Sequence, residues 1–175
     1  TAEAKARIRA LYGLDDPLYV QYGRWLSRMA RLYFGNSFLD DRPVIDKITE
    51  RLPNTLLLNV LSLGLIFVTA LPLGVLAAVK RGSWFDRAST IFVYVGFSIP
   101  TFWLALLLML VFGVKLGWLP ISGMMSLEAA DWPWWRRGWD LLQHLILPVG
   151  VSAFAGLAGI SRYARTSVLE VIRQD

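Results

Sequence analysis

Cysteine is absent from the 175 residues, and histidine occurs only once, at His144. Without cysteine there is no disulfide framework and no thiolate metal site. A single histidine excludes the His-Glu-x-x-His motif of membrane metalloproteases and a haem held by two histidines. The sequence also contains no G-x-x-x-x-G-K-[ST] loop, so we do not expect this chain to hydrolyse ATP itself. These absences leave no recognisable enzyme chemistry, and we predict that the chain is not an enzyme.

Charged residues are scarce, at 18% of the chain, and three long stretches lack them altogether. Residues 52–79, 88–114 and 141–161 contain no Asp, Glu, Lys or Arg. The first two stretches hold 28 and 27 residues, whereas a helix needs about 20 apolar residues to cross a bilayer core. None of the three alternates with period two, which argues against barrel strands. We therefore predict an all-α, polytopic membrane bundle with three transmembrane helices between residues 53 and 162.

Basic residues are concentrated in two of the segments that flank these stretches. The loop 80–87 carries three of them, and three more arginines follow the third stretch. The segment 115–140 has three basic residues, which three acidic residues balance. The positive-inside rule then predicts that 80–87 and the C-terminal segment 163–175 are cytoplasmic and that 115–140 is an outer loop. No basic and aromatic patch indicates nucleic-acid binding.

The first 52 residues are predicted to be helical and to lie outside the membrane on the outer face. Asp16-Pro17 is a helix start, followed by apolar residues at steps of four and three and by arginines on the opposite face. Such a helix fits the membrane interface and the surface of a soluble partner equally well. Five tryptophans in the outer loop favour an interfacial belt over a ligand cage. Pro133 among them predicts a short irregular hairpin.

Small residues recur at a spacing of four within the apolar stretches. Ala70, Gly74 and Ala78 form a ridge in the first stretch, and Gly156 and Gly159 contribute similar faces in the third. We predict that these faces let neighbouring helices pack closely.

Polar side chains are few within the predicted spans, and no ionisable residue lies in the middle of one. This pattern argues against a proton relay or a voltage sensor. The remaining polar groups could line a translocation path, or they could simply bond across helices and back to carbonyl groups. Those assigned to a path are Asn59, Ser62, Ser98 and Thr101.

Several short motifs, taken in order, resemble those of one protein family. They are GLDDPL at 13–18, RLPNTL at 51–56, AAVKRG at 77–82, GFSIPTFW at 96–103, LGWLP at 116–120, HLILP at 144–148 and the final segment 162–175. Each is weak alone, but their order and spacing cover nearly the whole chain. The chain resembles the inner-membrane permease subunits of oligopeptide, dipeptide and nickel ABC importers.

This resemblance implies a six-helix subunit in a bacterial or archaeal inner membrane, of which these residues would be the central part. It also implies a cytoplasmic coupling loop with an E-A-A…G signature, which docks on an ATPase subunit. Glu170 and Asp175 match the opening of that signature, and Val171 stands where many relatives have Ala. Arg165 could meet acidic groups of the ATPase beside this loop, although plain positive-inside anchoring explains it equally well.

The function implied is that of a permease passing peptides or a related small solute inward. Its partners would be a second permease subunit, a cytoplasmic ATPase that binds ATP, an extracytoplasmic substrate-binding protein and membrane lipid, with no nucleic acid and no cofactor in this chain. The alternative is a membrane-embedded scaffold or assembly component without a substrate path.

Overall fold

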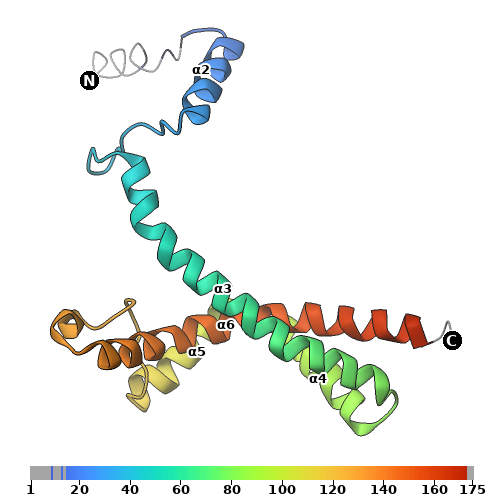
Figure 1. Cartoon of the computed structure of the whole chain (residues 1–175). Helices are drawn as coiled ribbons and strands as arrows, with labels where there is room; N and C mark the ends of the chain where they lie inside the picture. Colours follow the sequence, from blue (N-terminus) through green and yellow to red (C-terminus); the bar gives the residue numbers. More distant parts are fainter. Residues whose placement is uncertain (1–8, 10–12, 14, 173–175) are drawn as a thin grey trace. The chain divides into compact units, whose positions relative to one another are not determined.

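The computed structural model describes residues 9, 13 and 15–172, and its regular structure is helical apart from one short bridge between Asn36 and Pro43 (Figure 1). The α-helices are α2 (Leu18–Ala30), α3 (Val44–Val79), α4 (Trp84–Ser98), α5 (Thr101–Leu108) and α6 (Trp134–Ile172). A π-helical segment (Met109–Lys115) follows α5, and a 3₁₀ helix (Leu127–Asp131) precedes α6. The chain divides into two units, Thr1–Pro53 and Asn54–Asp175. The prediction of an all-α membrane protein is confirmed.

In the first unit, helix α2 begins one residue later than Asp16-Pro17 predicts, with Pro17 in the N-cap position. The Gln21 side chain donates a hydrogen bond to the Asp16 carbonyl at 2.7 Å, which fixes the start of the helix. The apolar side chains Leu18, Tyr22 and Trp25 are exposed, so the described residues of this unit leave one face of α2 uncovered.

Helices α3 and α6 are both long and apolar enough to cross a membrane, as the sequence predicts. Helix α3 has 36 residues and α6 has 39, so each reaches more than 50 Å at about 1.5 Å per residue. Only 28% of the most apolar window of α3 is buried within the chain, and 33% of that of α6. Most of their apolar surface is therefore available to lipid or to other helices.

The start of α6 contradicts the hairpin prediction around Pro133. Helix α6 begins at Trp134, and the Pro133 carbonyl accepts the first backbone hydrogen bonds, from the N–H groups of Arg136 and Arg137. Proline is well suited to the start of a helix because its φ is preset and its missing N–H would have no helical partner there. Trp134, Trp135 and Trp139 therefore stand on a helix and not in an irregular loop. At its other end, α6 continues through residues 163–172.

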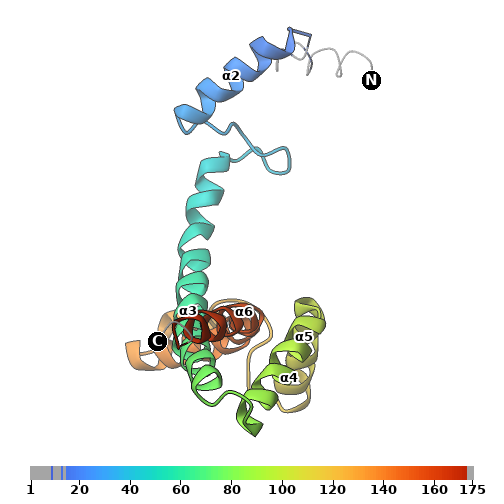
Figure 2. The ribbon, with the colours of Figure 1, turned by 90° about the vertical axis from the view of Figure 1, so that its right-hand side faces the viewer.

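The middle predicted span is a bent pair of helices and not one straight helix. The direction changes by 95° between Trp84–Gly96 and Thr101–Lys115. Ile99 and Pro100 adopt extended backbone angles at the break, because proline donates no hydrogen bond and disfavours helical geometry in the residue before it. The structure thus has two candidate spans, or three if the bent pair counts as one. Both α4 and α5 pack against α6 (Figure 2).

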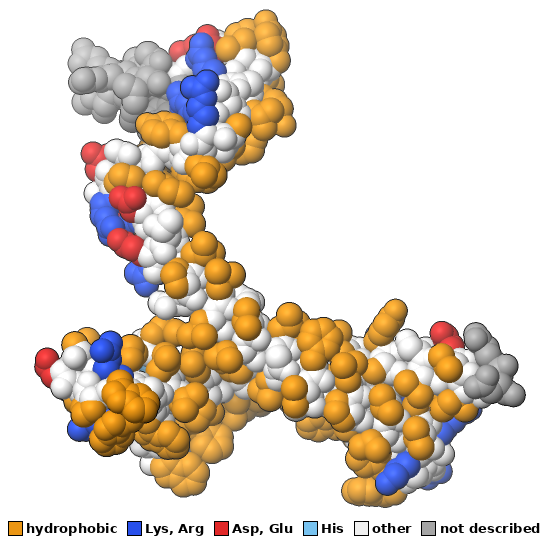
Figure 3. Space-filling view, in the orientation of Figure 1, with side chains coloured by type: hydrophobic (Ala, Val, Ile, Leu, Met, Phe, Trp, Pro, Cys, Tyr) orange, Lys and Arg blue, Asp and Glu red, His pale blue; other side chains and the backbone are white. Residues whose placement is uncertain are grey.

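The core of the second unit is built largely from small residues. Ile66, Ala70 and Ala153 form a buried cluster between α3 and α6, against which Leu157 and Ile160 pack. Large apolar side chains lie mainly on the outside, where Figure 3 shows them covering much of the visible surface. This inversion of the soluble pattern is expected of helices that pack through small residues and face lipid with large ones.

Candidate functional site

Helices α3 and α6 contact each other closely at Gly74. A Cβ atom added at Gly74 would lie 2.5 Å from the Ser161 carbonyl oxygen and 2.7 Å from the Ala164 Cβ atom. Ala70, Gly74 and Ala78 are all buried, as expected for a packing ridge. Gly156 plays the reciprocal part on α6, because a Cβ there would lie 2.4 Å from Ile66 Cδ1.

Gly159, the last of the predicted packing residues, is half-buried on α6. The structure thus brings Ala70 and Gly74 of the ridge against small residues of α6, and Ile66 lies over Gly156. For Ala78 and Gly159 the packing role stays a prediction.

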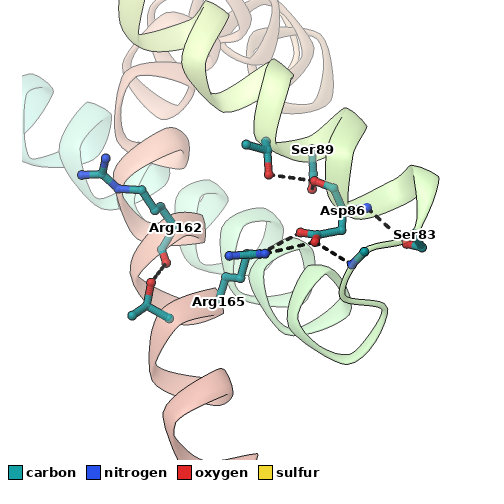
Figure 4. A network of polar contacts seen from close by, with 8 residues as sticks. Ser83, Asp86, Ser89, Arg162 and Arg165 are labelled. Carbon is teal, nitrogen blue, oxygen red and sulfur yellow. Dashed lines mark hydrogen bonds and ion pairs between the residues drawn. The ribbon is translucent and has the colours of Figure 1, made fainter.

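Helix α4 joins the same part of α6 through an ion pair. The Arg165 guanidinium donates two hydrogen bonds to the Asp86 carboxylate, from Nε to Oδ1 at 2.7 Å and from Nη2 to Oδ2 at 3.0 Å (Figure 4). The Gly82 N–H donates to the same carboxylate, to Oδ2 at 3.0 Å. The Asp86 side chain is 8% exposed and that of Arg165 is 31% exposed. This two-bond geometry is the strongest form of charge-assisted contact between side chains.

The local sequence explains why Asp86 can hold this position. Ser83 is the N-cap of α4, and its hydroxyl accepts a hydrogen bond from the Asp86 N–H at 3.3 Å. Gly82 takes a φ of +78°, a left-handed conformation that glycine adopts readily, and so turns its N–H toward the carboxylate. The negative charge also stands in the first turn of α4, where the helix dipole favours it.

The residues predicted for coupling are found in different situations. Glu170 is exposed near the end of α6, and the Val171 side chain beside it is 61% exposed. Arg165 has its acidic partner within the chain, at Asp86, whereas the sequence led us to consider one on another subunit. Asp175 lies outside the described residues.

The four residues predicted for a translocation path are not alike. Ser62 is buried, and Asn59, Ser98 and Thr101 are exposed. The Asn59 amide donates to the Thr55 carbonyl at 2.7 Å, and the Ser98 hydroxyl donates to the Tyr94 carbonyl at 2.9 Å. These two side chains thus bond back to their own helices. Their assignment to a path stays a prediction.

A second polar cluster connects the 116–133 loop to α6. The Asp140 carboxylate accepts hydrogen bonds from the Ser126 N–H at 2.8 Å and from the Ser126 hydroxyl at 2.6 Å. His144 Nδ1 lies 2.8 Å from the Asp140 carbonyl oxygen, at hydrogen-bond distance. Asp140 and His144 are both buried. The cluster holds the loop against the first turns of α6.

Next to this cluster is a cavity of about 380 Å³ between α3, α5, the loop and α6. Most of its lining is apolar, and the polar side chains at its wall are Ser122, His144 and Ser152. In the described part of the chain, no three His, Asp or Glu residues lie close enough together to hold a metal ion.

The first unit has polar contacts of its own beyond α2. The Lys47 ammonium donates to the Asp40 carboxylate at 2.6 Å and to the Ser37 hydroxyl at 2.9 Å. The Lys47 hydrogen bond, helped by that from Ser37, holds the pKa of Asp40 below its usual value. Arg42 also pairs with Glu50 across the start of α3. These exposed pairs order the turn before α3.

Sequence reasoning missed Asp86, Ser126 and Asp140 as structural residues. A local signal exists for Asp86, because Ser83 and Asp86 have the spacing of a capping box. Its pairing with Arg165 joins residues 79 positions apart, and that of Ser126 with Asp140 spans 14. Neither long-range pairing has a local sequence signal.

Comparison with known proteins places these features in a family. Residues 70–175 match the model of the binding-protein-dependent transport system inner membrane component. The chain is 42% identical over 165 residues, 94% of its length, to the oligopeptide transport system permease protein AppB of Bacillus subtilis, of which it covers 51%. It is 31% identical over 186 aligned positions to the dipeptide transport system permease protein DppB of Alkalihalophilus pseudofirmus, covering 99% of this chain and 56% of that protein.

It is also 32% identical to the inner membrane ABC transporter permease protein YejB of Escherichia coli O157:H7, over 99% of this chain and 48% of that protein. The chain thus spans about half the length of the curated relatives it matches. With the family model matching from Ala70 to the end of the chain, across the packed ridge, the ion pair and Glu170, the chain belongs to the family of binding-protein-dependent transport system inner membrane components.

Proposed function

We propose that the full-length protein is the permease subunit of an ABC importer that passes peptides or a related small solute inward. The observation that carries this proposal is the family match over residues 70–175, which includes the bent helix pair and the whole of α6. Oligopeptide transport is in the name of one of the relatives described above, and dipeptide transport is in the name of another. The family is an inner-membrane one, so the protein lies in the inner membrane, where α3 and α6 are long enough to span.

We assign ATP binding and hydrolysis to a separate cytoplasmic subunit, since this sequence has no phosphate-binding loop. A second permease subunit would cover the exposed apolar sides of the helices. An extracytoplasmic substrate-binding protein would deliver the cargo. Glu170 is our choice for the contact with the ATPase, because it is exposed near the end of α6 and resembles the opening of the family's coupling signature.

The test is to purify the tagged full-length subunit from its native membrane and to identify its partners by mass. We expect a second permease and a P-loop ATPase. We further expect Glu170→Lys to keep the permease partner and to lower ATPase recovery about tenfold, the scale of one lost charge-assisted contact. Uptake driven by ATP should fall with it.

Glu128→Lys is the matched control, because Glu128 is an exposed acid on the 3₁₀ helix and is predicted to face the opposite side of the membrane. It should retain the ATPase. If the unmodified subunit brings down no ATPase, the importer function is wrong and a scaffold role replaces it. If the ATPase is present but Glu170→Lys retains it fully, only the role of Glu170 is wrong.

A further inference from the structure

One short section of α6 is held from two sides. Gly74 of α3 presses against the Ser161 carbonyl and lies so close to Arg165 that an added Cβ would stand 3.1 Å from its backbone nitrogen. Asp86 at the start of α4 forms the two-bond ion pair with the Arg165 side chain (Figure 4). The contact with α3 is made by backbone and methyl groups, so it limits the distance between α3 and α6. The contact with α4 is made by hydrogen bonds, so it also constrains the orientation of α6.

A two-bond ion pair restricts rotation of α6 about its own axis. A guanidinium and a carboxylate joined by two parallel hydrogen bonds lie in one plane. With a single hydrogen bond, the guanidinium could rotate relative to the carboxylate. The Asp86 carboxylate is itself fixed by the Gly82 N–H and by the N-terminal turn of α4. Arg165 is therefore tied to a rigid anchor and not to a mobile side chain.

The orientation fixed at Arg165 extends to the exposed end of the helix. Helix α6 continues for seven residues past Arg165, to Ile172. Glu170 follows Arg165 by five residues, which places it about 7.5 Å further along the axis and roughly 140° around it. Glu170 thus points away from the ion pair, toward the side that α4 leaves open, and it is exposed there.

We propose that Asp86 and Arg165 are positioning residues that set the direction in which α6 presents Glu170 to the ATPase. This inference rests on the proposed function. The pair acts through α6 and does not contact the ATPase. It also connects the turn at 80–83 to α6, because the Gly82 N–H donates to the carboxylate that pairs with Arg165.

The test measures the position of the end of α6 directly. The described chain has no cysteine, so Lys80→Cys and Val171→Cys introduce a pair of spin-label sites at exposed positions on the turn and on α6. Pulsed electron spin resonance on the full-length subunit in its complex then gives the distribution of distances between the labels. With Asp86 and Arg165 intact, we expect one narrow peak.

We expect Arg165→Gln or Asp86→Asn to broaden that peak about twofold, because the planar two-bond contact is lost. Arg165→Lys keeps the charge and should give an intermediate width. The double variant Asp86→Asn with Arg165→Gln should give a peak no broader than either single variant does, since both changes remove the same contact. ATPase recovery should fall in the same order. Asp131→Asn, at an exposed acid on the 3₁₀ helix, should change neither quantity.

An unchanged distance distribution in the single variants would overturn the proposal. So would additive effects in the double variant, which would mean that the two residues act separately. If a single variant yields no folded subunit, the graded response of Arg165→Lys still decides the question. The distances can also be measured on the subunit without an ATPase, so a complex without an ATPase would refute the importer function while leaving the positioning role measurable.

Discussion

At position 74 of α3, close packing against α6 requires a glycine. The nearest obstacle to a Cβ atom is the Ser161 carbonyl oxygen at 2.5 Å, which belongs to the backbone and cannot move without displacing α6. We expect Gly74→Ala to lower the free energy of unfolding by about 1–3 kcal/mol, the usual cost of overpacking. Gly74→Leu should prevent assembly of the complex. Thermal unfolding of the purified subunit in detergent measures the first effect, and complex yield measures the second.

Gly64→Ala, ten residues earlier on α3, is the control for Gly74→Ala. A Cβ atom added at Gly64 meets nothing within 4 Å. Gly64→Ala should therefore stabilise α3 by up to about 1 kcal/mol, because alanine has the higher helix propensity. We therefore expect the free energy of unfolding to fall for Gly74→Ala and to rise for Gly64→Ala. Equal effects would mean that α3 and α6 do not pack at Gly74.

At the scale of elements, the Ser126–Asp140 contact determines how firmly the 116–133 loop is held. Asp140→Ala leaves the Ser126 N–H and hydroxyl without their acceptor; a fully buried group would lose about 1–3 kcal/mol, and Ser126 is half-buried, so we expect the low end of that range. We expect faster hydrogen exchange at the Ser126 amide. Ser126→Ala removes only the hydroxyl bond and should have a smaller effect. Glu128→Ala should leave the exchange rate of the Ser126 amide unchanged. If that amide exchanged as fast in Glu128→Ala as in Asp140→Ala, the Ser126–Asp140 contact would not be what holds the loop.

The elements themselves could be predicted only where a single physical cause dominates. Residues 52–79 and 141–161 read as spans because charge is excluded from a bilayer, and α3 and α6 contain them. The bend in the middle span has a visible cause, Pro100, but prolines occur inside intact helices as well. Pro148 lies within α6, so the residue type alone does not locate the break.

The candidate site was harder to predict than the helices. The small-residue ridge at Ala70, Gly74 and Ala78 could be read from its spacing, because one helix face is a local property. The sequence also predicts small-residue faces on α6, but it does not specify which of them packs against the ridge. The Asp86–Arg165 pair depends on how α4 and α6 pack, and nothing near either residue in the sequence specifies the other. The positive charge of Arg165 could be explained equally well by membrane orientation.

At the scale of the whole molecule, the described helices leave most of their apolar surface uncovered. Less than a third of the apolar window of α3 is buried, and a third of that of α6. The chain also spans about half the length of its relatives. This uncovered apolar surface is available to lipid and to other helices, including the second permease subunit that we propose.

Membrane orientation is the property of the whole molecule on which every assigned partner depends. The coupling role that we propose requires the 80–83 turn and Glu170 to be in the cytoplasm, and the basic residues of 80–87 predict this. Single cysteines at Lys80 and at Ser122, both exposed, report the two sides. We expect a membrane-impermeant maleimide to label Ser122→Cys in intact cells or spheroplasts and Lys80→Cys only after lysis, with the subunit that lacks either introduced cysteine as background. The reverse pattern would put Glu170 on the outer side, where no ATPase can reach it.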